Sequence, residues 1–141
     1  MLWINRFIFA AVIVGLPISL ASAIAPTKDS LAVVRKNVER ERAVLVDVRE
    51  KAEWDKGHIK DSVLLPLSAL KKGLDKKKLE EKLPEKKVLY TFCVVGKRAV
   101  TAGGILKELG YEVRPLKPGY KQLLEAGFKK AKKEQDDQSE D

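Results

Sequence analysis

The sequence predicts an α/β fold: a doubly wound, mainly parallel sheet of four to five strands with helices on both faces. Short continuous apolar runs recur along the chain, and such runs are typical of strands buried on both faces of a parallel sheet. Segments of helical character separate these runs, and this alternation implies right-handed crossovers. With 141 residues, 45% of them hydrophobic, the chain can form one domain around a single core.

The first half of the predicted domain contains one helix, two strands and a short helical turn between the strands. Asp29 or Ser30 can cap a helix that extends to about Arg40. The strands are the runs AVLVDV at 43–48 and DSVLLPL at 61–67. The segment between them is highly charged, and we expect it to form only one helical turn.

The second half repeats this alternation. Residues 67–83 have helical character, but Gly73 and Asp75 are expected to split them into two helices. The remaining predicted elements are a strand at 87–92, a helix from about Lys97 to Gly110, a strand at 111–116 and a last helix from Pro118.

The N-terminus, residues 1–25, has the features of an export signal. One early cation precedes an uncharged apolar stretch, and small residues follow it in a pattern that fits cleavage after Ala23 or Ala25. The alternative is an uncleaved membrane anchor formed by residues 7–25, because about 20 apolar residues can span a bilayer. We therefore expect a periplasmic or otherwise exported protein, with membrane attachment only if this segment stays uncleaved.

The domain is predicted to span residues 26–128, and residues 129–141 form a charged tail that we expect to be disordered. The chain carries 28 Lys and Arg against 20 Asp and Glu, a net charge of +8. Basic residues are not interleaved with aromatic ones, so a nucleic-acid partner is not indicated. The excess positive charge is expected mainly to form a solvated, soluble surface; the alternative is weak attraction to an anionic membrane surface or to anionic substrates.

Cys93, the single cysteine, stands at the carboxyl end of the predicted strand 87–92. Ligands of such sheets bind beyond the carboxyl ends of the strands. If a helix begins near Lys97 or Arg98, the amides of residues 94–98 turn around the sulfur and form an anion nest. A helix N-terminus and nearby cations favour the thiolate form of Cys93. The alternative for these residues alone is a small, buried and inert side chain.

Three segments resemble the rhodanese-like family. VLVDVREKAEWDKGHIKDSVLLPL at 44–67 resembles the opening signature, YTFCVVGKRA at 90–99 the active-site loop, and LGYEVRPLKPGYKQLLEAG at 109–127 the closing strand, turn and helix. The match covers roughly residues 29–128 in the family's order and spacing. The family fold is a doubly wound sheet with its catalytic cysteine between a strand and a helix.

The resemblance implies a sulfurtransferase without a cofactor. Cys93 takes sulfur from a thiosulfate-like donor as a persulfide and passes it to cyanide or a thiol, which can belong to an acceptor protein. No second cysteine is present to resolve the persulfide, so the acceptor must be external. The donor-binding groups implied are Val94, Val95, Gly96, Lys97 and Arg98.

Other residues of the opening signature are expected to support the site. Asp47, Arg49 and Glu53 are predicted to make buried or half-buried polar contacts that fix the strand end, and His58 is predicted to pack and to form hydrogen bonds. A metal site is not predicted, because one His and one Cys cannot complete one.

Two alternatives remain open. The family often has a small polar residue at the position of Val95 and serine at the position of Ala99, so this loop is more apolar. A sulfur carrier or protein-binding module of low activity is therefore the main alternative. A cysteine phosphatase or arsenate reductase needs a longer loop for a tetrahedral anion, whereas only four residues separate Cys93 from Arg98.

Overall fold

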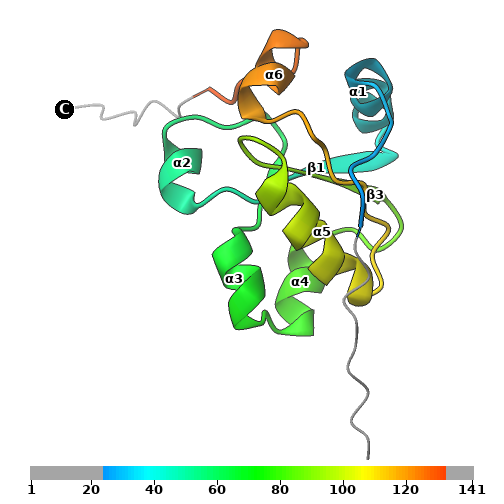
Figure 1. The fold of residues 1–141 in the computed structure, drawn as a ribbon, viewed down its shortest axis with the longest axis vertical. Coiled ribbons are helices and arrows are strands. Elements are labelled where there is room, and N and C mark those ends of the chain that lie inside the picture. Colours follow the sequence, from blue (N-terminus) through cyan, green and yellow to red (C-terminus); the bar gives the residue numbers. More distant parts are fainter. Residues whose placement is uncertain (1–23, 133–141) are drawn as a thin grey trace, which may run out of the picture.

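The computed structural model describes residues 24–132, so the predicted export signal and most of the predicted tail lie outside the described residues. Figure 1 shows helices packed around a small sheet. The elements in chain order are α1 (Leu31–Glu39), β1 (Ala43–Asp47), α2 (Lys51–Asp55), β2 (Val63–Leu64), α3 (Leu67–Lys72), α4 (Lys76–Lys82), β3 (Val88–Phe92), α5 (Lys97–Glu108) and α6 (Tyr120–Glu125).

The three strands form a parallel sheet in the order β2-β1-β3, which confirms the predicted fold class. Asp47, the last residue of β1, pairs with Leu64 of β2 and with Phe92 of β3. The three strands therefore end together at one edge of the sheet. Cys93, which follows Phe92, lies at that edge.

A fourth segment extends this sheet without forming a regular strand. The predicted strand 111–116 pairs with β3 through a parallel bridge between Leu89 and Val113, and the Leu116 N–H donates to Thr91 O at 2.8 Å. The Thr27 N–H donates in turn to Pro115 O at 2.7 Å. Thr27 thus lies beside this segment.

Helices cover both faces of the sheet, as predicted (Figure 1). One core cluster packs β1 and β3 residues against α3, α4 and α5, and it includes Val46, Leu89 and Cys93. The other packs the opposite face against α1 and α6, and it includes Leu45 and Tyr90. This alternation along each strand places Cys93 on the α5 side of the sheet.

Local sequence signals account for most element boundaries. Ser30 caps α1, since its hydroxyl accepts a hydrogen bond from the Val33 N–H at 3.3 Å. Gly73 ends α3 and Asp75 precedes α4, as expected. β2 is shorter than the predicted strand 61–67: only Val63 and Leu64 pair in register with β1, although the Leu65 N–H also donates to Asp47 O at 2.9 Å.

The ordered chain extends past the predicted domain boundary at residue 128. The Lys60 N–H donates to Lys129 O at 2.8 Å and the Ala131 N–H donates to His58 O at 2.9 Å. Lysine-rich composition suggested a disordered tail here, but these bonds join backbone groups and are independent of side-chain type. Residues 133–141 lie outside the described residues.

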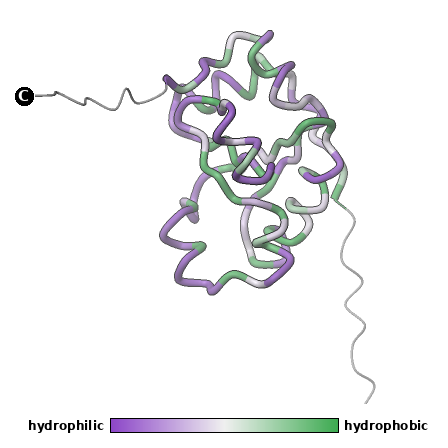
Figure 2. Tube along the Cα trace, turned by 90° about the vertical axis from the view of Figure 1, so that its left-hand side faces the viewer, coloured by the Kyte–Doolittle hydropathy of each residue, from purple (hydrophilic) through white to green (hydrophobic). Residues whose placement is uncertain are grey.

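Charged residues gather over α3 and α4. Figure 2 shows this lysine-rich part of the chain as mostly hydrophilic, at the lower end of the molecule. Among residues 24–132, no helix combines the length and apolar character needed to cross a bilayer.

Candidate active site

Cys93 lies in a tight connection between β3 and α5. Only Val94, Val95 and Gly96 separate it from the first residue of α5. Gly96 is the N-cap of this helix and has a left-handed backbone with φ of 87°. A side chain at this position would be strained, so glycine allows the chain to turn directly from strand into helix.

The turn brings the sulfur of Cys93 to the N-terminus of α5. The Gly96 N–H donates a hydrogen bond to Cys93 Sγ at 3.1 Å. Unpaired amides and the positive end of the helix dipole lie on this side of the loop. Because Cys93 is only 1% exposed, these groups interact with the sulfur with little screening by water. The arrangement can stabilise a thiolate or the negative charge of a sulfur adduct.

The loop rests on the turn before α6. The Tyr120 N–H donates to Cys93 O at 2.9 Å. A Cβ placed on Gly119 would lie 1.9 Å from Val94 O, so no other residue fits there without moving the loop. Sequence reasoning did not single out Gly119 as a site residue, because its constraint comes from a chain segment 25 positions earlier. The glycine in the closing turn of the family motif was the available signal.

Arg98 is held by an acidic side chain of α2. Its guanidinium donates to both carboxylate oxygens of Glu53, at 2.6 and 2.9 Å. These hydrogen bonds lower the pKa of Glu53 to about 2 and raise that of Arg98. Sequence analysis assigned Arg98 to donor binding. The structure places its bidentate fork on Glu53, whereas Lys97 at the start of α5 is exposed.

The predicted supporting residues Asp47 and Arg49 form a buried ion pair beneath the loop. Arg49 Nη2 lies 2.7 Å from Asp47 Oδ2 and also donates to Gly57 O at 2.9 Å. The Arg49 guanidinium lies over the ring of Tyr120, 4.1 Å from its centroid. This stack joins the end of β1 to the turn that supports Cys93.

His58 packs against α2. Its ring stacks on Trp54 with centroids 3.7 Å apart, and Nδ1 lies 3.3 Å from Trp54 O. These contacts fit the packing and hydrogen-bonding role predicted from sequence. Within residues 24–132, no cluster of three or more His, Cys, Asp or Glu side chains is arranged to hold a metal ion.

The two valines after Cys93 differ from its buried surroundings. Val94 is 46% exposed and Val95 is 72% exposed. Exposed apolar side chains next to a buried sulfur give the loop an apolar outer surface. The predicted donor-binding residues thus separate into buried Gly96, ion-paired Arg98 and outward-facing Val94, Val95 and Lys97.

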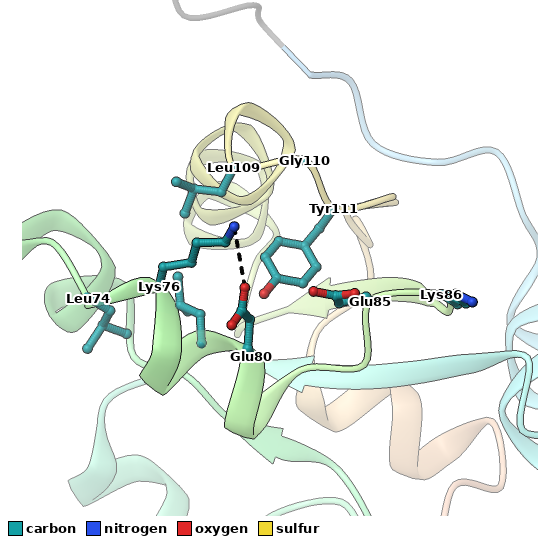
Figure 3. Close-up of a pocket in the computed structure, with 9 residues that line it drawn as sticks. Leu74, Lys76, Glu80, Glu85, Lys86, Leu109, Gly110 and Tyr111 are labelled. Carbon is teal, nitrogen blue, oxygen red and sulfur yellow. Dashed lines mark ion pairs between the residues drawn. The ribbon is translucent and has the colours of Figure 1, made fainter.

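A cavity of about 400 Å³ lies at the opposite end of the sheet (Figure 3). We call it the Tyr111 pocket; its lining is Leu74, Lys76, Leu79, Glu80, Glu85, Lys86, Leu109, Gly110 and Tyr111. In Figure 3 the Tyr111 side chain points towards Glu80 and Glu85. Sequence analysis did not identify this pocket.

Comparison with known proteins agrees with the fold. Residues 30–126 match the family of rhodanese-like domains. The chain belongs to this family. Its single cysteine thus lies at the strand-to-helix loop where the sequence resemblance placed the family's nucleophile. Family membership and the structural neighbours support sulfurtransferase activity in general.

Several solved structures are similar to this rhodanese-like chain. The human single-domain sulfurtransferase TSTD1 is 31% identical, with 72% of this chain and 97% of that chain covered and a TM-score of 0.62. The Saccharomyces cerevisiae single-domain sulfurtransferase RDL2 is 27% identical over 75% and 94% of the chains, with a TM-score of 0.61. A rhodanese-related protein from Thermoplasma volcanium is 27% identical over 72% and 93%, with a TM-score of 0.59. No curated protein matches the chain.

Proposed function

We propose that this chain is an exported sulfurtransferase that moves sulfane sulfur from a thiosulfate-like donor to cyanide or a thiol, through a persulfide on Cys93. The observation that carries the proposal is the position of Cys93 Sγ at the N-terminus of α5, with the Gly96 N–H 3.1 Å away. Export rests on the sequence of residues 1–25.

The reaction has two steps that balance at one sulfur. The Cys93 thiolate attacks the outer sulfur of thiosulfate, the S–S bond of the donor breaks, and sulfite leaves with the bonding electron pair. The terminal persulfide sulfur is then attacked by cyanide or a thiolate, and the electron pair of the S–S bond returns to Cys93. Dividing the transfer in this way replaces one difficult step by two easier ones.

The groups around Cys93 have separate parts in this mechanism. The helix N-terminus stabilises negative charge on the sulfur. Lys97, which is exposed at the mouth of the loop, attracts the anionic donor. Glu53 holds Arg98 beside the loop, so Arg98 contributes positive charge from a fixed position.

The test is production of thiocyanate from thiosulfate and cyanide by the purified protein. Intact mass before and after thiosulfate should rise by one sulfur atom, and it also reports whether the N-terminal segment has been removed. A Cys93→Ser variant should lose both properties, with activity lower by at least about 1,000-fold. Full activity of this variant would remove Cys93 from the mechanism. Tyr111→Phe, in the pocket at the other end of the sheet, is the matched control and should keep full activity.

A second candidate is a sulfur carrier or protein-binding module with little turnover. The exposure of Val94 and Val95 favours it, since an apolar loop surface suits a macromolecular partner better than a small anion. A protein that takes up no sulfur from small donors but captures one partner specifically would support this candidate over the enzyme. Hydrolysis of an aryl phosphate that depends on Cys93 would instead indicate phosphatase chemistry.

A further inference from the structure

The exposed side chain of Val95 separates two grooves on the outside of the active-site loop. One groove, of about 520 Å³, runs along the first turns of α5, and the other, of about 500 Å³, reaches α1 and α6. Val95 and Lys117 line both grooves. We call this area the Val95 surface; its main residues are Pro26, Leu31, Val95, Val100, Lys117 and Pro118.

The Val95 surface is apolar with positive charge at its rim. Lys97 lines the first groove and Lys117 lines both, while no Asp or Glu is among the lining residues of either groove. A partner that combines apolar and acidic side chains is therefore complementary to it in both hydrophobicity and charge.

The Val95 surface lies next to the reacting atom. Val95 is two residues from Cys93, and Gly96, whose N–H contacts the sulfur, lines the first groove. The sulfur itself is buried, so an acceptor has to approach against the loop that covers it. A molecule seated on the Val95 surface therefore lies against the loop that holds the sulfur, in contact with the residue whose N–H bonds to it.

The size of the two grooves on the Val95 surface suits a polypeptide acceptor better than cyanide. Cyanide is far smaller than either groove and makes no use of them. A polypeptide can place one side chain in each groove on either side of Val95, and lysines at the rim can pair with its carboxylates. These observations favour a protein acceptor.

We propose that the Val95 surface binds the sulfur acceptor, a protein segment whose cysteine is flanked by apolar and acidic side chains. This inference rests on the proposed function. The acceptor thiolate attacks the terminal sulfur of the Cys93 persulfide, the S–S bond to Cys93 breaks, and the acceptor leaves as a persulfide while Cys93 returns to its thiolate form.

The experiment compares two synthetic peptides with one cysteine each. Both carry leucines beside the cysteine; one adds glutamates and the other adds lysines at the same positions. The protein is loaded with thiosulfate, and kcat/KM for sulfur transfer to each peptide is measured. We expect the glutamate peptide to be preferred by at least about tenfold, with a preference that weakens as salt is added.

Lys117→Glu tests the surface directly. Its side chain is exposed, so the variant should fold and should form thiocyanate from thiosulfate and cyanide at the normal rate. Transfer to the glutamate peptide should fall about fivefold to tenfold, and transfer to the lysine peptide should rise. Lys77→Glu on α4 changes the net charge equally at a distant exposed site and should alter neither peptide.

The outcomes separate this inference from the proposed function. Equal use of both peptides, or a preference unchanged by Lys117→Glu, overturns the inference while thiocyanate formation still supports the enzyme. If thiosulfate gives no persulfide, the proposed function fails, and binding of a serine analogue of the glutamate peptide then tests the Val95 surface alone. Self-association that is abolished by Lys117→Glu would show that a second copy of the chain is the occupant instead.

Discussion

The two ends of the sheet are built from different kinds of group. At the carboxyl end, Cys93 is contacted by backbone amides of the loop and of the α6 turn. At the amino end, the Tyr111 pocket is lined mainly by side chains, including an ion pair of 3.5 Å between Lys76 and Glu80 (Figure 3). Helix α5 connects the two, because its first residues follow Cys93 and its last residues border the pocket.

This difference follows from the direction of α5. Its N-terminus lies at Cys93, where the Gly96 N–H and the positive end of the helix dipole stabilise negative charge on the sulfur. Its C-terminus borders the Tyr111 pocket, which is lined mainly by side chains. The proposed chemistry lies at the carboxyl end of the sheet, where ligands of parallel sheets bind, and not in the Tyr111 pocket.

Among variants that compare the two ends of the sheet, Gly119→Ala is expected to have the largest effect on stability and activity. The new Cβ would overlap Val94 O, so the loop must move, and we expect a loss of at least about 2 kcal/mol in unfolding free energy together with most of the activity. Urea denaturation and thiocyanate formation measure the two effects.

Gly110→Ala at the other end of α5 is the matched control. Gly110 has φ of 95° with open space around it, so alanine costs about 1 kcal/mol of backbone strain and leaves activity unchanged. Similar losses of activity in both variants would mean that contact with the loop is not what makes Gly119 necessary.

A smaller effect is expected from Glu53→Gln. The amide cannot hold Arg98 by two charged hydrogen bonds, so we expect kcat/KM for thiosulfate to fall about tenfold while Cys93 still forms a persulfide. Glu53→Asp should restore part of this loss. Asp55→Asn breaks an exposed ion pair with Lys51 on the same helix and should leave kcat/KM unchanged. An equal fall in kcat/KM in Asp55→Asn would show that the effect comes from disturbing α2 and not from the loss of the Glu53–Arg98 pair.

The smallest effect concerns the pH dependence of stability. Because Arg98 lowers the pKa of Glu53 from 4.5 to about 2, the pair stabilises the folded state fully above the ordinary value and loses this contribution as pH falls towards 2. With both side chains about a third exposed, we expect the stability difference between the natural protein and Glu53→Gln to shrink by only about 1 kcal/mol on acidification. Chemical denaturation at several pH values measures it.

A matched variant at the amino end tests whether this dependence is local. Glu80→Gln removes the carboxylate that pairs with Lys76, whose side chain is 87% exposed, and should give a nearly constant difference across the same range. If the Glu53→Gln difference is also constant, the Arg98 pair contributes little to folding.

Most elements of the fold were predictable because their signals are local. Ser30 marks the start of α1 through its own hydrogen bond, and Gly73 marks the end of α3 through its backbone freedom. The apolar runs at β1 and β3 indicated buried strands, since both faces of each are covered. The segment predicted as a strand at 111–116 runs parallel to β3 through one bridge and three backbone hydrogen bonds. The pairing of Lys129 with Lys60 escaped prediction, because it depends on a partner distant in sequence.

The candidate site also has features that local sequence signals predict and contacts that they do not. The sequence alone identified Cys93 and its loop, because a strand, a cysteine, a glycine and a helix start are adjacent in the chain. It also named Asp47, Arg49, Glu53 and Arg98, but not that Glu53 holds Arg98 or that Tyr120 stacks on Arg49.

Tertiary structure decided those partners. Glu53 reaches Arg98 from α2, Tyr120 stacks on Arg49, and Gly119 admits the Val94 carbonyl only because α6 packs behind the loop. The sequence by itself determined that Cys93 lies between a strand and a helix, since helix and strand signals act over a few positions. The residues around the sulfur come from distant segments that meet when helices cover the two faces of the sheet. Short-range sequence patterns do not predict such contacts.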